Sequence, residues 1–280
     1  MLTAIALTPS APVLVPELAG AAAAEVAQFC NAAFTAAATL PDRWIVIGVG
    51  VEDQRIGPDT RGTFAGYGVD VPVALSPDAP VAIADLPLCA LIAGWLRGRV
   101  APAARAQVRV FAADLDADEA LARGRALRTE IDETADPIGV LVVADGANTL
   151  TQSAPGGYDP DAEPVQTALD DALAAGDGAA LRRLPNAIIG RVAYQVLAGL
   201  SEAKSQGAEE LQRGAPYGVG YFVGTWTPKG TGTPKGTGTP KGTGTPQGTG
   251  TPKGTGTPKG TGTPKGTGTS KVSSTGTPGA

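Results

Sequence analysis

Four short apolar runs of strand length alternate with alanine-rich, helix-like segments along the first 226 residues. A run with hardly any polar residue is typical of a strand that is covered on both faces, as in parallel sheets. Strand followed by helix, repeated along the chain, is the order of an α/β fold. We therefore expect an α/β domain with these runs at its centre: Leu2–Leu7, Arg43–Val49, Gln107–Ala112 and Ile138–Val143.

Apolar residues at helical spacing predict helices between and after these strands. The expected helices cover residues 17–40, 86–96, 116–134, 164–174, 177–183 and 187–204, with Asn186 as the cap of the last one. Two more segments have β character: Tyr67–Leu75, with valines at alternate positions, and the glycine-rich stretch Gly214–Trp226. The polar segment 50–66 is long for a connection, so we expect it to be functional or lid-like.

The composition changes sharply after Trp226. From Thr227 to Gly268 the hexapeptide TPKGTG repeats seven times, with Gln247 in place of one lysine. The repeat has no large apolar side chain to bury, which predicts a folded domain over residues 1–226 and a disordered tail over 227–280.

The charge is distributed as unevenly as the composition. All 27 acidic residues but only 15 of the 22 basic ones precede residue 227, so the formal charge is −12 before that point and +7 after it. A body this acidic argues against the binding of nucleic acid or anionic membranes through its folded surface. No stretch approaches the roughly 20 uninterrupted apolar residues of a membrane-spanning helix, so we expect no membrane partner.

Cys30 and Cys89 are the only cysteines, and both lie in apolar, helix-like contexts. We interpret them as buried free thiols, which are typical of the reducing cytoplasm. The apolar N-terminal stretch has no basic residue before Arg43 and is interrupted by three prolines, so we do not expect a cleaved signal peptide.

The most polar loop directly after a strand is Ala144–Asp159, written ADGANTLTQSAPGGYD. It follows the run Ile138–Val143, and open α/β folds bind their ligands at such carboxyl ends of strands. The loop contains two acids, an amide, several hydroxyl groups and a Pro-Gly-Gly turn. A proline-rich loop over residues 8–16, after the first strand, is a second candidate.

Several chemistries are constrained by residues that the chain lacks. It contains no histidine, so a Ser-His-Asp or Cys-His arrangement is excluded. The glycines of Gly48-Val49-Gly50 form half of a dinucleotide-binding fingerprint, but no helix follows directly. Asp145, Asp159 and Asp161 could bind a hard cation through oxygen, although we prefer to interpret the last two as a solvated turn and helix cap.

Two motifs resemble those of a known family. PSAPVLVPELAG, residues 9–20, resembles the P-H-P-P-x-L-V-P-E-x-G opening of class III extradiol ring-cleavage dioxygenases of the subunit-B type and of the related Memo-like proteins. Residues 144–169 resemble the family's G-D-L-S-H-R-L-x-x-x-A-P-x-G-Y-D-P segment and the helix after it. The resemblance implies a mixed central sheet flanked by helices, ferrous iron as the cofactor and an oxidoreductase activity.

The chain departs from both motifs where the family has histidine. Ser10 occupies the position of an iron-binding histidine, and Asn148 occupies that of a histidine that acts as acid/base or ligand. Facial-triad iron chemistry requires imidazole and carboxylate ligands, and residues 48–53 offer no imidazole either. A serine is a poor ligand, and an amide exchanges no proton near neutral pH. We therefore expect that iron, and any metal ligand set for it, has been lost.

The first functional hypothesis is a divergent family member that binds a small polar or aromatic ligand, or acts as a scaffold, without iron-dependent catalysis. Asp145 and Asn148 would be the remnants of the acid/base loop. The expected ligand-binding residues are Ser10, Asp53, Tyr158 and Tyr217.

The alternative hypothesis is a residual metal-dependent enzyme, either a dioxygenase or a hydrolase or lyase that uses oxygen ligands. Asp145, Asp159 and either Glu52 or Asp53 would hold the ion. Whether the chain is an enzyme therefore stays open at this point. The resemblance to a subunit-type family also implies association into a homo- or hetero-oligomer.

Overall fold

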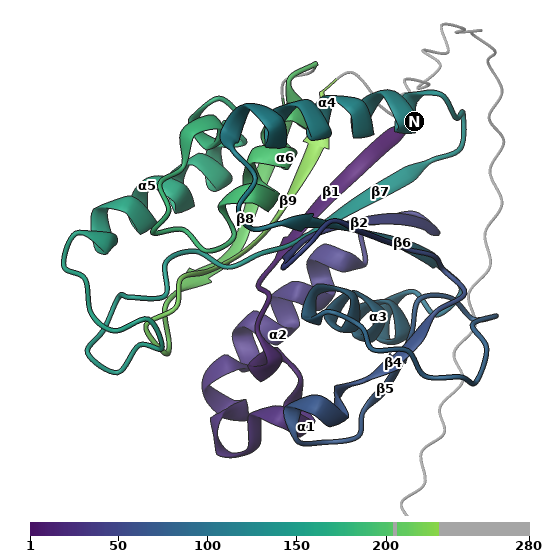
Figure 1. Cartoon of the computed structure of the whole chain (residues 1–280), viewed down its shortest axis with the longest axis horizontal. Coiled ribbons are helices and arrows are strands. Elements are labelled where there is room, and N and C mark those ends of the chain that lie inside the picture. Colours follow the sequence, from purple (N-terminus) through teal and green to yellow (C-terminus); the bar gives the residue numbers. More distant parts are fainter. Residues whose placement is uncertain (204–205, 230–280) are drawn as a thin grey trace, which may run out of the picture. The chain divides into compact units, whose positions relative to one another are not determined.

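The structure is a computed structural model that describes residues 1–203 and 206–229. Within these residues seven strands form one sheet. They are β1 (Leu2–Thr8), β2 (Arg43–Gly50), β3 (Gln54–Ile56), β6 (Arg105–Ala112), β7 (Ile138–Val143), β8 (Gln206–Gly214) and β9 (Tyr221–Pro228). Their order is β3-β6-β2-β7-β1-β9-β8 (Figure 1). The four central strands β6, β2, β7 and β1 are parallel, and β3, β9 and β8 each run antiparallel to a neighbour.

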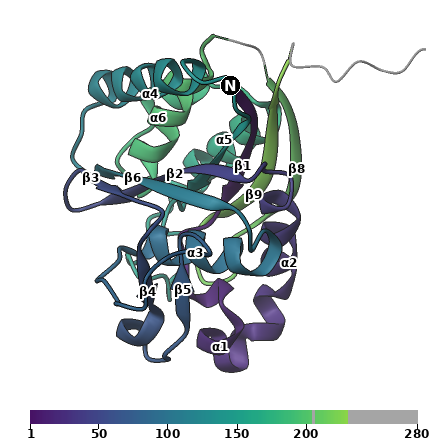
Figure 2. The same cartoon turned by 90° about the vertical axis from the view of Figure 1, so that its right-hand side faces the viewer.

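Helices cover both faces of this sheet (Figures 1 and 2). They are α1 (Pro16–Ala19), α2 (Ala23–Ala37), α3 (Leu88–Val100), α4 (Ala117–Asp132), α5 (Ala162–Ala175) and α6 (Arg191–Ser201). The first three lie on one face and the last three on the other, and short 3-10 turns cover residues 12–14, 20–22, 64–67 and 180–183. The α/β class with a mixed central sheet flanked by helices is confirmed.

Adjacent residues of the central strands belong to different cores. Trp44 and Val46 of β2 pack with α2 and α3, whereas Ile45 and Ile47 pack with α4 and α6. A strand whose two faces are both covered needs apolar residues at every position. This explains why the central strands were visible in the sequence as near-continuous apolar runs.

The prediction of a single strand over Tyr67–Leu75 is wrong. The structure has instead a separate two-stranded sheet of β4 (Arg61–Thr63) and β5 (Pro72–Ala74), with a 3-10 turn before β5. Gly68 follows this turn in the left-handed region at φ 104°. That conformation, which glycine adopts without strain, turns the chain just before the alternating valines, of which only Val73 lies in β5.

The end of the described chain also differs from expectation. Helix α6 starts at Arg191 with Gly190 as its N-cap, so the cap predicted at Asn186 is wrong, and residues 177–183 contribute only a 3-10 turn. The strand β8 was not expected, because its sequence QGAEELQRG has no apolar pattern. Strand β9 runs to Pro228, two residues past the predicted boundary at 226. The predicted disorder of the repeat lies outside the described residues.

Two smaller expectations can be compared with the structure. Cys30 and Cys89 are both buried and free, as predicted. None of the helices in the described part of the chain is long and apolar enough to cross a membrane.

Candidate functional site

The carboxyl ends of β1 and β7 lie side by side. Thr8, the last residue of β1, is in parallel register with Val143, the last residue of β7. The loop after β1 leads to the helices on one face, and the loop after β7 leads to α5 on the other. Open α/β proteins bind their ligands where the connections of neighbouring strands diverge in this way, so the topology marks this edge as the candidate site.

Asp145 is the central charged group at this edge of the sheet. Its side chain is buried, with the residue 8% exposed, and its Oδ1 accepts a hydrogen bond of 2.7 Å from the backbone N–H of Ser10. Burial raises the pKa of the Asp145 carboxyl to about 7, and the Ser10 N–H opposes this shift only in part. A carboxyl that changes charge near neutral pH is suited to accept or deliver a proton.

Two tyrosines lie near this carboxyl, and a buried threonine ends the neighbouring strand β1. The hydroxyl of Tyr194, on α6, donates to the backbone oxygen of Ala144 over 2.9 Å. Burial, and then the nearby charge of Asp145, raise the pKa of both Tyr194 and Tyr221 above the ordinary value, so both phenols stay protonated. The buried Oγ1 of Thr8 has no hydrogen-bond partner within the described residues. The site thus combines one titratable group with neutral hydroxyls.

The loop that holds Asp145 is fixed from behind by Gln166 of α5. Its Oε1 accepts from the backbone N–H of Ala147 over 2.8 Å, and its Nε2 donates to Asp170 Oδ1 over 2.8 Å. A Cβ at Gly146 or at Gly220 would lie only 2.0 or 2.1 Å from this Oε1. A side chain at either position would displace the Gln166 amide from its two hydrogen bonds, whereas glycine lets the loop and the start of β9 approach it.

Sequence reasoning missed this supporting pair. Gln166 and Asp170 are four residues apart, which places them on one face of a helix, and Leu169 and Leu173 are buried on the same helix. Two polar residues at that spacing among buried leucines are a signal of a buried polar pair. Burial raises the pKa of Asp170 to about 6, against the hydrogen bond from Gln166.

The other residues expected at the site lie on the surrounding loops. Asn148 packs against Gly156, where an added Cβ would lie 2.5 Å from its Oδ1. Tyr158 is 51% exposed, and the hydroxyl of Tyr217 donates to Glu25 Oε2 over 2.9 Å. Within the described residues none of these three side chains hydrogen bonds to Asp145. The structure therefore joins Ser10 to Asp145 and leaves Asn148, Tyr158 and Tyr217 around them.

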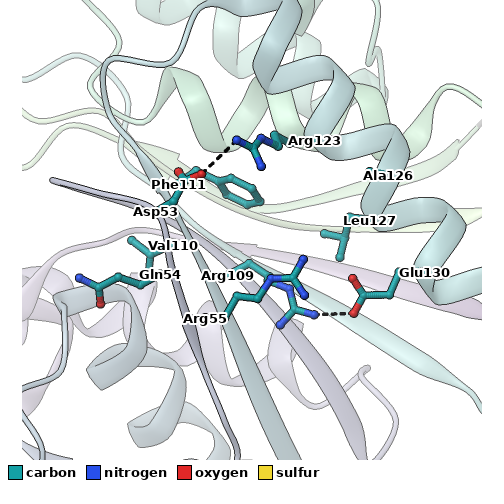
Figure 3. A pocket seen from close by; sticks show the side chains of 10 residues that line it. All are labelled: Asp53, Gln54, Arg55, Arg109, Val110, Phe111, Arg123, Ala126, Leu127 and Glu130. Atoms are coloured by element: carbon teal, nitrogen blue, oxygen red, sulfur yellow. Dashed lines mark hydrogen bonds and ion pairs between the residues drawn. The ribbon is translucent and has the colours of Figure 1, made fainter.

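Asp53 belongs to a different environment. Its Oδ1 accepts from the backbone N–H of Ala112 at the end of β6, and its Oδ2 forms a 3.3 Å ion pair with Arg123 of α4 (Figure 3). Asp159 is engaged within its own turn, where its Oδ1 accepts from the N–H of Asp161 over 3.0 Å. Across residues 1–203 and 206–229 no group of three acidic or cysteine side chains is arranged to hold a metal ion.

The residues at the strand ends do not fit a ferrous site of the facial-triad type. The donors there are one carboxylate, whose Oδ1 already accepts from Ser10, together with a serine hydroxyl and an amide. Such a site requires imidazole ligands, and the chain has none. What this arrangement can do is bind a donor group of a ligand and exchange a proton with it.

Comparisons with known proteins give a similar fold but no family. No family model matches the chain, and no curated protein matches it. A solved structure with a similar fold is that of the uncharacterized protein JW3007 from Escherichia coli K12, at a TM-score of 0.51 and 11% sequence identity. The match covers 80% of this chain and 99% of that protein. At this identity the likeness shows the fold alone.

Proposed function

We propose that this chain is a divergent extradiol-dioxygenase-like protein that binds a small polar or aromatic ligand at the ends of β1 and β7, without iron-dependent catalysis. The observation that carries the proposal is the buried carboxyl of Asp145. Within the described residues its one hydrogen bond comes from the Ser10 N–H, so its Oδ2 is left for a donor group of the ligand.

The surroundings of Asp145 favour a ligand with hydroxyl donors and an apolar body. Tyr194 and Tyr221 are both almost fully buried near the carboxyl, so they make its surroundings apolar, and the Tyr194 hydroxyl already donates to the Ala144 oxygen. Because the carboxylate accepts hydrogen bonds and its protonated form accepts fewer, such a ligand binds more tightly above the pKa of about 7 than below it. Catechol has this chemistry and serves as the probe.

The proposed setting is the cytoplasm, which suits two buried free thiols. We also propose that the chain associates with a second copy of itself, or with another subunit that carries the catalytic residues. Light scattering on the purified chain measures the first, and co-purification from native lysate measures the second.

The direct test is anaerobic reconstitution with ferrous iron, followed by metal analysis and exposure to oxygen with catechol. We expect less than stoichiometric iron and no ring-cleavage product. Calorimetry with catechol is expected to show binding that weakens at least about tenfold in Asp145→Ala. The matched control is Asp161→Ala, an exposed aspartate after the same loop, which keeps the parent affinity. Stoichiometric iron together with ring cleavage would overturn the proposal.

One observation favours a second candidate, a metal-dependent hydrolase or lyase that uses oxygen ligands. A carboxyl with a pKa of about 7 at a strand end is suited to proton transfer next to a bound ion. This candidate requires that Asp145→Ala lowers the affinity for Mg²⁺ or Mn²⁺. Equal affinities of the parent and the variant would exclude it.

A further inference from the structure

A cavity lies away from Asp145, between the edge strand β3, its neighbour β6 and helix α4 (Figure 3). Its volume is about 190 Å³. Three arginines line it, one from each element: Arg55 from β3, Arg109 from β6 and Arg123 from α4. The cavity is built partly from the polar segment 50–66, whose length pointed to a role beyond connecting two strands.

Arg55 and Arg109 are directly opposite each other in the antiparallel pair of β3 and β6. Both side chains line the cavity (Figure 3), and they are close enough for the charge of Arg55 to act on Arg109. Like charges at directly opposed positions destabilise a strand pair. Residue pairs that conflict with stability in this way are expected at functional or strained sites.

Arg109 is also incompletely paired for a buried charge. The residue is 4% exposed, and its Nη2 donates to Glu130 Oε1. Its Nε and Nη1 have no hydrogen-bond partner in the described part of the chain. Burial lowers the pKa of Arg109, and the charge of Arg55 adds to this effect in spite of Glu130. Two buried donors on one guanidinium are thus left for an acceptor.

The acids that line the cavity are already engaged. Asp53 bonds to Arg123 and to a backbone N–H, and Glu130 bonds to the Nη2 of Arg109. Arg55 has no ion pair within the described residues. Arg123 is paired with Asp53 and also with Glu119, which lies outside the lining. The positive charge that is left for an anion is therefore that of Arg55 and the incompletely paired Arg109, on a body whose formal charge is −12. Such a local reversal of sign attracts anions.

We propose that this cavity binds a small organic oxyanion. Two of its oxygens accept hydrogen bonds from Arg109 and Arg55, because guanidinium groups match the geometry of carboxylate and phosphate groups. Its apolar part packs against Phe111 and Leu127, which form the apolar wall. A cavity of roughly 150 Å³ is known to hold benzene, so this cavity accommodates an anion about the size of benzoate.

The test is calorimetry on the whole chain with three probes: benzoate, inorganic phosphate and the neutral isostere benzamide. We expect an oxyanion to bind at least about tenfold more tightly than benzamide, since charge-assisted hydrogen bonds are the stronger ones. Tighter binding of benzoate assigns the site to carboxylates with an apolar body, and tighter binding of phosphate assigns it to phosphate groups. Equal binding of all three probes, or binding of none, would overturn the proposal.

Variants locate the binding in this cavity. Arg109 is buried, so the exposed Arg55 carries the test. Arg55→Gln is expected to weaken oxyanion binding about tenfold, and Glu130→Gln to strengthen it by freeing Arg109. The matched control Arg183→Gln removes an exposed arginine elsewhere and leaves the affinity unchanged. An equal loss in Arg183→Gln and Arg55→Gln would show non-specific attraction and contradict the site.

Discussion

The Asp145 site and the Arg109 cavity differ in whether their buried charged group can become neutral. At the ends of β1 and β7, Asp145 is buried with one N–H donor, and its carboxyl becomes neutral below a pKa of about 7. Between β3 and β6, Arg109 is equally buried, but a guanidinium keeps its proton in proteins. The buried carboxyl can lose its charge by taking up a proton. The buried guanidinium stays charged and therefore requires an anion beside it. Glu130 supplies only part of that requirement.

The largest expected change in the free energy of unfolding comes from replacing the Asp145 carboxyl. Its pKa in the folded state is raised from 3.8 to about 7, so folding favours the protonated form and the free energy of unfolding falls as pH rises through this window. Asp145→Asn removes the charge and is expected to raise the free energy of unfolding at pH 8 by up to about 4 kcal/mol. At pH 4 the variant and the parent should differ by less than about 1 kcal/mol.

Urea unfolding at both pH values measures this difference. The exposed Asp161→Asn, changed in the same way, should stay within about 0.5 kcal/mol of the parent throughout. An Asp145→Asn variant that is no more stable at pH 8 than at pH 4, relative to the parent, would mean that the carboxyl is not desolvated.

The next largest change in stability is expected at Gln166, which supports the loop that contains Asp145. Gln166→Met keeps the length of the side chain but leaves the Ala147 N–H and the buried Asp170 carboxyl without their partner. We expect a loss of about 3 kcal/mol in the free energy of unfolding, because unsatisfied buried groups are costly. Gln152→Met, in an exposed part of the same loop, is the control for the added thioether. A loss below about 1 kcal/mol would mean that the amide does not fix the loop.

A smaller effect is expected at the guanidinium. Glu130→Gln removes the negative partner of Arg109 and should cost about 2 kcal/mol, less than a fully buried pair because Glu130 is partly exposed. Added benzoate or phosphate should recover part of this loss by binding to the folded state. The exposed neighbour Glu133→Gln should show neither the loss nor the recovery. Thermal unfolding with and without the anion gives both quantities.

The smallest expected change in stability is a gain, and it is expected at Arg55. Arg55→Gln removes the like charge opposite Arg109 and should stabilise the anion-free protein by about 0.5 kcal/mol. The same change should weaken anion binding. A variant that lost both stability and affinity would show that Arg55 supports the fold rather than the ligand.

The two sites also differ in how far the sequence predicted them. The central sheet was predictable because burial on both faces makes strands such as β2 and β7 apolar throughout. The position of the loop that contains Asp145 was predictable because it follows such a strand. The resemblance singled out Ser10, whose N–H lies 2.7 Å from Asp145 Oδ1, and the part that either residue takes in binding stays a prediction. The polar edge strand β8 was not predictable, because its residues QGAEELQRG follow no burial period.

The Arg55 and Arg109 cavity could not be predicted from the sequence. These residues are 54 positions apart, and only the register of β3 on β6 places them opposite each other. Strand pairing of this kind is a tertiary property without a local signal. Asp53 was expected at the first site, but its hydrogen bond to Ala112 and its ion pair with Arg123 place it in the second.

The titration of the Asp145 carboxyl, followed by ¹³C NMR with Asp145→Asn to assign the resonance, tests the central claim most directly. The account predicts a midpoint near pH 7 in the free protein and a lower midpoint when catechol is bound, because the ligand's donor stabilises the carboxylate. A midpoint near the ordinary value of about 4, unchanged by catechol, would contradict a buried carboxyl that serves as the binding group.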